Sequence, residues 1–173
     1  MANYIGAQYF GYYLGESGEF PGWITSGATL YLSSVHFKEK NITNEIYNGF
    51  INQYLNAAKA NFNTLVLQPV DELKQTNFDW ENIIEKGKSA DIFKMLEYVV
   101  GRKTLENILK QTLQDYKNSV ITTDTFQSVV DSVSNKQTNW FFKQWIRENK
   151  NLDYAVTKIK QDKVGNKYQV KIT

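Results

Sequence analysis

The stretch WITSGATLYLSSVHF, from Trp23 to Phe37, decides the fold. Apolar side chains run through most of it, at Ile24, Leu30, Tyr31, Leu32 and Val35. A segment of this length with so much apolar surface is typical of a helix that packs inside a core. We therefore predict a buried helix over residues 23–37 and expect the other segments to pack around it.

Further helices are predicted on both sides of this segment. Residues 3–14 are apolar nearly all round, which also predicts a buried helix, and residues 15–22 form a loop. Downstream, apolar residues follow helical spacing in most segments up to residue 146, and Pro69 interrupts the pattern. The predicted helices cover 41–61, a short turn at 70–73, 88–100, 105–116, a segment that begins at 123, and 140–146. Gly101 is expected to end the helix over 88–100, and Thr123 is expected to cap the helix that begins there.

The last residues change from helical to strand-like patterning. Residues 153–160 and 167–173 alternate, with Tyr168, Val170 and Ile172 on one face, and Gly165-Asn166 lies between the two runs. This arrangement predicts a β-hairpin. The fold class is therefore mainly α, with about seven helices in a domain over residues 1–150 and a hairpin over residues 151–173. The hairpin is expected to pack on the helices or to begin a sheet domain.

Charge and hydropathy exclude some classes of partner. The net charge is +2, and Lys alternates with Glu and Asp along the chain, so the surface does not have the basic footprint of a nucleic-acid-binding protein. No stretch approaches the roughly 18 uncharged apolar residues of a membrane-spanning helix. These features therefore predict neither a nucleic-acid partner nor a membrane span, and they indicate neither a compartment nor an oligomeric state.

The inventory of reactive side chains is short. The chain has one histidine, His36, and no cysteine, whereas a catalytic zinc site usually has at least two nitrogen or sulfur ligands. Cysteine nucleophiles and zinc fingers are excluded for the same reason. A Ser–His–Asp triad would have to use His36, but no G-x-S-x-G motif occurs. We interpret His36 as a helix residue at or near the surface.

Two neighbouring motifs resemble the zinc-binding segment of the M1 family of aminopeptidases. The family reads H-E-x-x-H-Q-W-F-G and then W-L-N-E-G-F-A. Here residues 3–11 read N-Y-I-G-A-Q-Y-F-G, and residues 23–28 read W-I-T-S-G-A, with the same spacing between the two motifs. The resemblance implies a helical, thermolysin-like subdomain.

Three later stretches extend this resemblance to about residues 3–160. Residues 86–96 read K-G-K-S-A-D-I-F-K-M-L, which is similar to the family's Y-x-K-G-A-x-V-L-x-M-L. Residues 122–126 read T-T-D-T-F and resemble T-T-x-D-F. Residues 139–145 read N-W-F-F-K-Q-W and resemble D-W-F-F-x-Q-W. All the stretches occur in the family's order.

The resemblance also implies that the family's chemistry is lost. The two histidine ligands fall on Asn3 and Ala7, the general-base glutamate on Tyr4, the third zinc ligand on Ser26, and the tyrosine that stabilises the oxyanion on Lys86. Zinc normally polarises the substrate carbonyl and activates water, and the glutamate and tyrosine assist it. We therefore expect no zinc, no other cofactor and no catalytic residue. These five are vestigial active-site positions.

Two uses of such a domain stay open. As a pseudopeptidase, it would bind a peptide or protein in the old cleft, at the vestigial positions, with Tyr9 and Trp23 as further lining. Alternatively, the cleft has no ligand and the domain is a structural module of a larger protein. Fold alone does not separate these uses.

Two alternatives involve other chemistry. Ser26 and Lys86 would form the nucleophile and base of a hydrolase if burial lowered the pKa of the lysine. Glu16 and Glu19, with water, would hold a hard cation such as Ca²⁺ or Mg²⁺ weakly. Two loop glutamates are more often solvated, so we expect no metal there.

Overall fold

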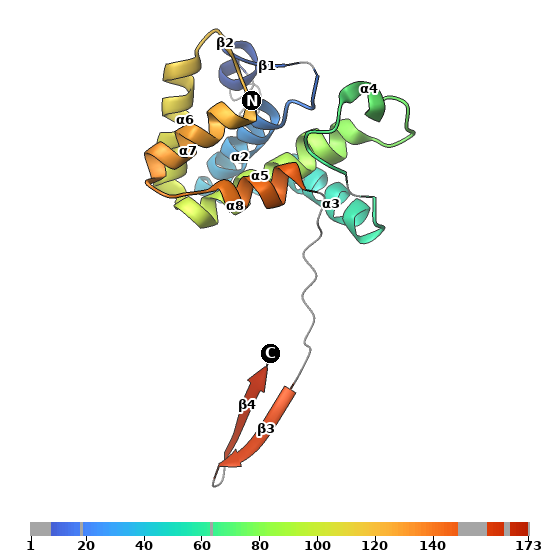
Figure 1. Ribbon diagram of the computed structural model, residues 1–173, viewed down its shortest axis with the longest axis vertical. Helices are drawn as coiled ribbons and strands as arrows, with labels where there is room; N and C mark the ends of the chain where they lie inside the picture. Colours follow the sequence, from blue (N-terminus) through green and yellow to red (C-terminus); the bar gives the residue numbers. More distant parts are fainter. Residues whose placement is uncertain (1–7, 18, 63, 149–158, 165–166, 173) are drawn as a thin grey trace.

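A computed structural model describes residues 8–17, 19–62, 64–148, 159–164 and 167–172. These residues are mainly helical, as predicted, and form seven α-helices, three π-helical segments and four strands. The α-helices are α2 (Trp23–Glu39), α3 (Glu45–Lys59), α4 (Val70–Leu73), α5 (Ser89–Val100), α6 (Arg102–Tyr116), α7 (Thr123–Ser134) and α8 (Asn139–Phe142). The π-helical segments are η1 (Gln8–Tyr12), η2 (Glu81–Lys88) and η3 (Lys143–Arg147). Figure 1 shows α2 and α5 at the centre of the helical body, with α6 and α7 on one side and α3 and α4 on the other.

Aromatic side chains form the centre of the core. Trp23 on α2 lies 5.9 Å from Phe93 on α5 and 5.7 Å from Phe126 on α7, measured between ring centroids. Phe142 on α8 meets Trp23 edge to face. All four rings are buried, so the predicted buried helix over 23–37 is confirmed and extends to Glu39.

Gly27 sets how closely α2 approaches α5. A Cβ atom at this position would lie 2.6 Å from Cδ2 of Phe93 and 2.8 Å from the carbonyl oxygen of Ser89. Real Cβ atoms do not come so close to a backbone oxygen, so only glycine allows this crossing. The motif glycine that precedes Ala28 therefore has a packing role in this chain.

The N-terminal prediction needs correction. Residues 3–7 lie outside the described residues, and the chain leaves the helical conformation after Tyr12. Strand β1 (Leu14–Glu16) then pairs in parallel with β2 (Ser119–Ile121). Strands of three residues are too short for periodicity to reveal. Tyr9 and Tyr13 are exposed, so this segment is not buried all round as predicted, although Phe10 is.

The helix expected from Lys88 begins seven residues earlier. Segment η2 runs directly into α5, and the Ser89 hydroxyl donates a hydrogen bond to the carbonyl oxygen of Ile84, 3.0 Å away. A Cβ atom on Gly87 would lie 2.5 Å from the carbonyl oxygen of Phe50 on α3. This close approach to α3 depends on tertiary packing, which explains why the irregular sequence pattern did not reveal the segment.

The caps largely follow the prediction. Gly101 has φ of 88° and ends α5, a conformation that favours glycine. The cap of α7 is Thr122 and not Thr123, because Thr122 and Thr125 exchange side-chain and backbone hydrogen bonds as a capping box. Thr123 instead accepts a hydrogen bond from Nε1 of Trp23, 3.0 Å away.

The predicted C-terminal hairpin is present. Strand β3 (Ile159–Val164) pairs antiparallel with β4 (Lys167–Ile172), so the first strand continues to Val164, beyond the predicted end at Lys160. Residues 151–158 lie outside the described residues, and the predictions for the packing of the hairpin and for the domain boundary stay predictions.

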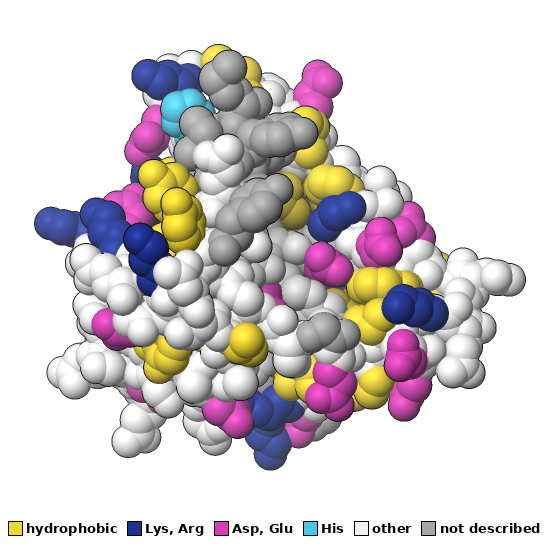
Figure 2. All heavy atoms as spheres, turned by 90° about the horizontal axis from the view of Figure 1, so that it is seen from above, with side chains coloured by type: hydrophobic (Ala, Val, Ile, Leu, Met, Phe, Trp, Pro, Cys, Tyr) yellow, Lys and Arg dark blue, Asp and Glu magenta, His cyan; other side chains and the backbone are white. Residues whose placement is uncertain are grey.

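The surface carries charges of both signs. On the face shown in Figure 2, Lys and Arg side chains are interspersed with Asp and Glu, and single apolar side chains lie between them. Within the described residues, no helix is both long enough and apolar enough to cross a membrane.

Candidate functional site

Glu16 caps the first turn of α2. Its carboxylate accepts hydrogen bonds from the backbone N–H of Ile24 at 3.2 Å, the backbone N–H of Thr25 at 2.8 Å, and the hydroxyl of Thr25 at 2.7 Å. A carboxylate at a helix N-terminus is stabilised by unpaired N–H groups and by the helix dipole. Strand β1 ends at Glu16 and places it there.

Burial nevertheless raises the pKa of Glu16, and the negative charge of Glu85 raises it further. The hydrogen bonds from Thr25 and Ile24 oppose this rise because they favour the charged form. The Glu16 and Glu85 carboxylates both lie close to Gly22, at 3.4 and 3.7 Å from the position that a Cβ atom would take. Two carboxylates therefore lie beside the N-terminus of α2.

Ser26, which the sequence predicts to be a vestigial ligand position, is held by Glu85. Its hydroxyl donates a hydrogen bond to Oε1 of Glu85, 2.9 Å away. Glu85 lies on η2, next to Lys86, so the structure brings α2 and η2 together at these two positions. The hydroxyl proton of Ser26 is therefore engaged by Glu85.

Lys86 has partners of its own on η2 and α3. Its ammonium donates a hydrogen bond to Oδ1 of Asn82 at 2.9 Å and lies 5.2 Å from the ring centroid of Phe50. Both side chains are fully described, and Ser26 and Lys86 are not hydrogen-bonded to each other. The arrangement does not bring together the nucleophile and base of the alternative hydrolase.

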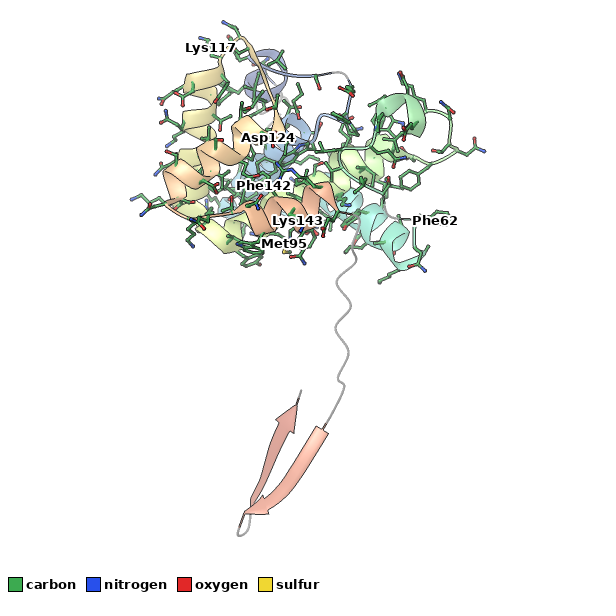
Figure 3. The ribbon with its side chains drawn as sticks, in the orientation of Figure 1. Phe62, Met95, Lys117, Asp124, Phe142 and Lys143 are labelled. Atoms are coloured by element: carbon green, nitrogen blue, oxygen red, sulfur yellow. The ribbon has the colours of Figure 1, made fainter. Side chains whose placement is uncertain are left out.

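A cleft of about 420 Å³ opens beside this cluster. Glu16, Phe20 and Trp23 line one side, and the start of α7 lines the other. Across the cleft Arg147 forms an ion pair with Asp124, 2.5 Å apart, and donates a hydrogen bond to Gln127. Figure 3 shows Asp124 at the beginning of α7. The cleft combines aromatic walls with three carboxylates, including that of Glu19.

Only some of the other predicted site residues are described, and not all of these lie at the cleft. Asn3, Tyr4 and Ala7 lie outside the described residues. Neither Ser26 nor Lys86 lines this cleft. Trp23 does, although its ring is almost fully buried, whereas Tyr9 is 53% exposed and is not part of the lining. Tyr9 is therefore a surface residue in this structure.

The two glutamates that were expected to be solvated differ from each other. Glu16 is half-buried and caps a helix, contrary to the expectation, whereas Glu19 is exposed, as expected, and lines the cleft. Within the described residues, no group of three histidine, cysteine or acidic side chains is placed to hold a metal ion. The absence of zinc stays a prediction.

His36 lies in the last turn of α2 and is exposed, as predicted. Its ring contacts Phe37 edge to face, and the nearby Ser34 hydroxyl donates a hydrogen bond to the carbonyl oxygen of Tyr31. These contacts do not form a catalytic triad.

Sequence reasoning did not identify Glu85 or Thr25 as members of the site. Glu85 lies in a segment without clear periodicity, so nothing in the local pattern indicated which way it faces. Comparisons with protein-family models, curated proteins and solved structures found no match to this chain.

Proposed function

We propose that this chain is a catalytically inactive domain of the M1 aminopeptidase type, which binds a peptide or protein segment in the cleft beside α2. The observation that supports this best is the bonding of Ser26. The position that would carry a zinc-ligand carboxylate carries a hydroxyl bonded to Glu85, and the nearby Glu16 carboxylate caps a helix. Both groups are engaged within the protein.

The lining of the cleft supports peptide binding. Phe20 is half-buried and provides apolar contact surface, with the buried Pro21 and Trp23 behind it, while Thr122 and Glu19 provide hydrogen-bonding groups. Sites that bind ligands usually combine an apolar wall with a few polar groups in this way. The cleft is large enough for one or two side chains of an extended peptide.

Two experiments test the loss of catalysis. Metal analysis after dialysis is expected to find no stoichiometric zinc, because the three positions of the zinc ligands carry Asn3, Ala7 and Ser26. Aminoacyl reporter substrates are expected to release no product. Stoichiometric zinc, or activity that a chelator blocks, would contradict the proposal.

Selection of peptides tests binding. Random heptapeptides displayed on phage are selected on the immobilised protein, and enriched sequences are then synthesised and titrated. We expect Phe20→Ala to weaken their binding at least tenfold, because the ring is part of the cleft wall. Tyr98 is 74% exposed and does not line the cleft, so Tyr98→Ala should leave binding unchanged. Failure to enrich any peptide would favour a structural module instead.

A further inference from the structure

A second and larger cavity lies between α3, α4 and η2. Its volume is about 710 Å³, and it shares no lining residue with the cleft beside α2. The last turn of α3 contributes Ala57, α4 contributes Leu73, and η2 contributes Ile83. Neither the M1-like motifs nor the proposed function accounts for this cavity, which lies in the range of volumes typical of small-molecule sites.

The apolar lining includes two phenylalanine rings that do not stack on other rings. Phe62 is 65% exposed at the rim, and Figure 3 shows it projecting beyond the end of α3. Phe78 lies half-buried in the connection before η2. Among the described residues, neither ring has an aromatic partner, whereas most rings of the core do. Leu73, which is almost fully buried, forms the floor.

The charges around this cavity have one predominant sign. Asp79 is the charged side chain in its described lining. Residues 71–81, some of which line it, contain four acidic residues and one lysine, Lys74, which lies 3.9 Å from Asp71. The ammonium of the buried Lys88 lies behind the wall and donates a hydrogen bond to the carbonyl oxygen of Thr64. Asp79 therefore gives the mouth of the cavity a negative charge.

Asp79 retains acceptor capacity for a ligand. Its Oδ1 accepts the backbone N–H of Asn82 at 3.3 Å, and its Oδ2 accepts the side-chain amide of the same residue at 3.0 Å. A carboxylate offers about four lone-pair positions, so each oxygen can accept a further donor. Asp79 is exposed to solvent, which leaves it accessible from the mouth.

We propose that this cavity binds a small organic cation, an amine with an apolar ring whose hydrocarbon body lies among Phe62, Leu73 and Phe78 and whose ammonium pairs with Asp79. Aromatic faces attract cations, and a carboxylate at the mouth adds a charge-assisted hydrogen bond. A neutral ligand of the same shape keeps the apolar contacts and lacks the ion pair. An anionic one is repelled by the acidic mouth.

The test compares three ligands that differ in charge. 2-Phenylethylamine, 2-phenylethanol and 3-phenylpropionate are titrated into the full chain, and binding is followed by isothermal calorimetry and by amide shifts in NMR spectra. We expect the amine to bind about tenfold more tightly than the alcohol, which corresponds to one favourable charge contact, and the acid to bind most weakly.

Matched variants locate the effect. Asp79→Asn keeps a side chain that caps a helix well, and it should reduce the preference for the amine to within about twofold while the alcohol still binds. Asp115→Asn, an exposed acid on α6, should leave the preference intact. Ala57→Trp fills the cavity and should abolish binding of both ligands, with circular dichroism as the check on folding.

Several results would overturn the proposal: equal affinity for amine and alcohol, an unchanged preference in Asp79→Asn, binding that survives in folded Ala57→Trp, or no saturable binding. These outcomes do not bear on the cleft beside α2, because no residue lines both sites. The proposed peptide-binding function and the proposed amine site can therefore fail separately.

Discussion

Replacement of Gly27 by alanine tests the close crossing of α2 and α5. The added Cβ atom would meet the ring of Phe93 at 2.6 Å and the carbonyl oxygen of Ser89 at 2.8 Å. Phe93 is fully buried, and the Ser89 oxygen belongs to the backbone of α5, so neither can move aside alone. The helices must separate, and this disrupts the packing of the aromatic core.

The magnitude follows from two opposing effects. Overpacking of a well-packed core costs about 1–3 kcal/mol, and a backbone contact places Gly27→Ala near the upper end. Alanine is better than glycine in a helix by about 1 kcal/mol. We therefore expect a net loss of about 2 kcal/mol in the free energy of unfolding, or a decrease of about 4–8 °C in the melting temperature.

Gly49→Ala is the matched control. Gly49 lies inside α3, and nothing is within 4 Å of the position that its Cβ atom would take. The same substitution should stabilise the protein there by up to about 1 kcal/mol. Urea and thermal unfolding followed by circular dichroism measure both variants. If Gly27→Ala is as stable as Gly49→Ala, the described crossing of α2 and α5 is wrong.

Three further predictions concern buried or capping groups. Glu16→Ala should destabilise the protein by about 1–2 kcal/mol, because two backbone N–H groups of α2 lose their acceptor; a variant as stable as the wild type in urea would contradict the role of cap. Burial lowers the pKa of Lys88 from 10.5 to about 8 in the folded protein. Between about pH 8 and 10.5 the unfolded chain therefore holds this proton more tightly than the folded protein does. The free energy of unfolding consequently rises with pH over this range. The free energy of unfolding should increase by about 1 kcal/mol from pH 7.5 to about 9, where tyrosines with a pKa near 10 are still mostly protonated, and this increase should be absent in Lys88→Met. Thr122→Ala should cost about 1 kcal/mol through loss of the α7 cap, while Ser128→Ala on the exposed face of α7 should cost less than about 0.5 kcal/mol in the same urea assay.

Much of the helical architecture could be predicted from the sequence. Apolar spacing indicated the buried segment that begins at Trp23, and Gly101 marked the end of α5, because a glycine at positive φ commonly ends a helix. The Gly165-Asn166 dipeptide between two alternating runs of sequence likewise predicted the hairpin of β3 and β4. These are local signals, since each depends on residues that are close in the chain.

The sequence by itself determined the chemical inventory, namely one histidine and no cysteine, and it determined most of the helices. Only the tertiary structure decided that β1 pairs with β2 across about a hundred residues, and that Glu85 meets Ser26 from a different helix. It also decided that Glu16 caps α2 where a solvated side chain was expected. The physical reason is that local periodicity reports which side of a helix is apolar, whereas contacts between distant segments depend on how the helices pack.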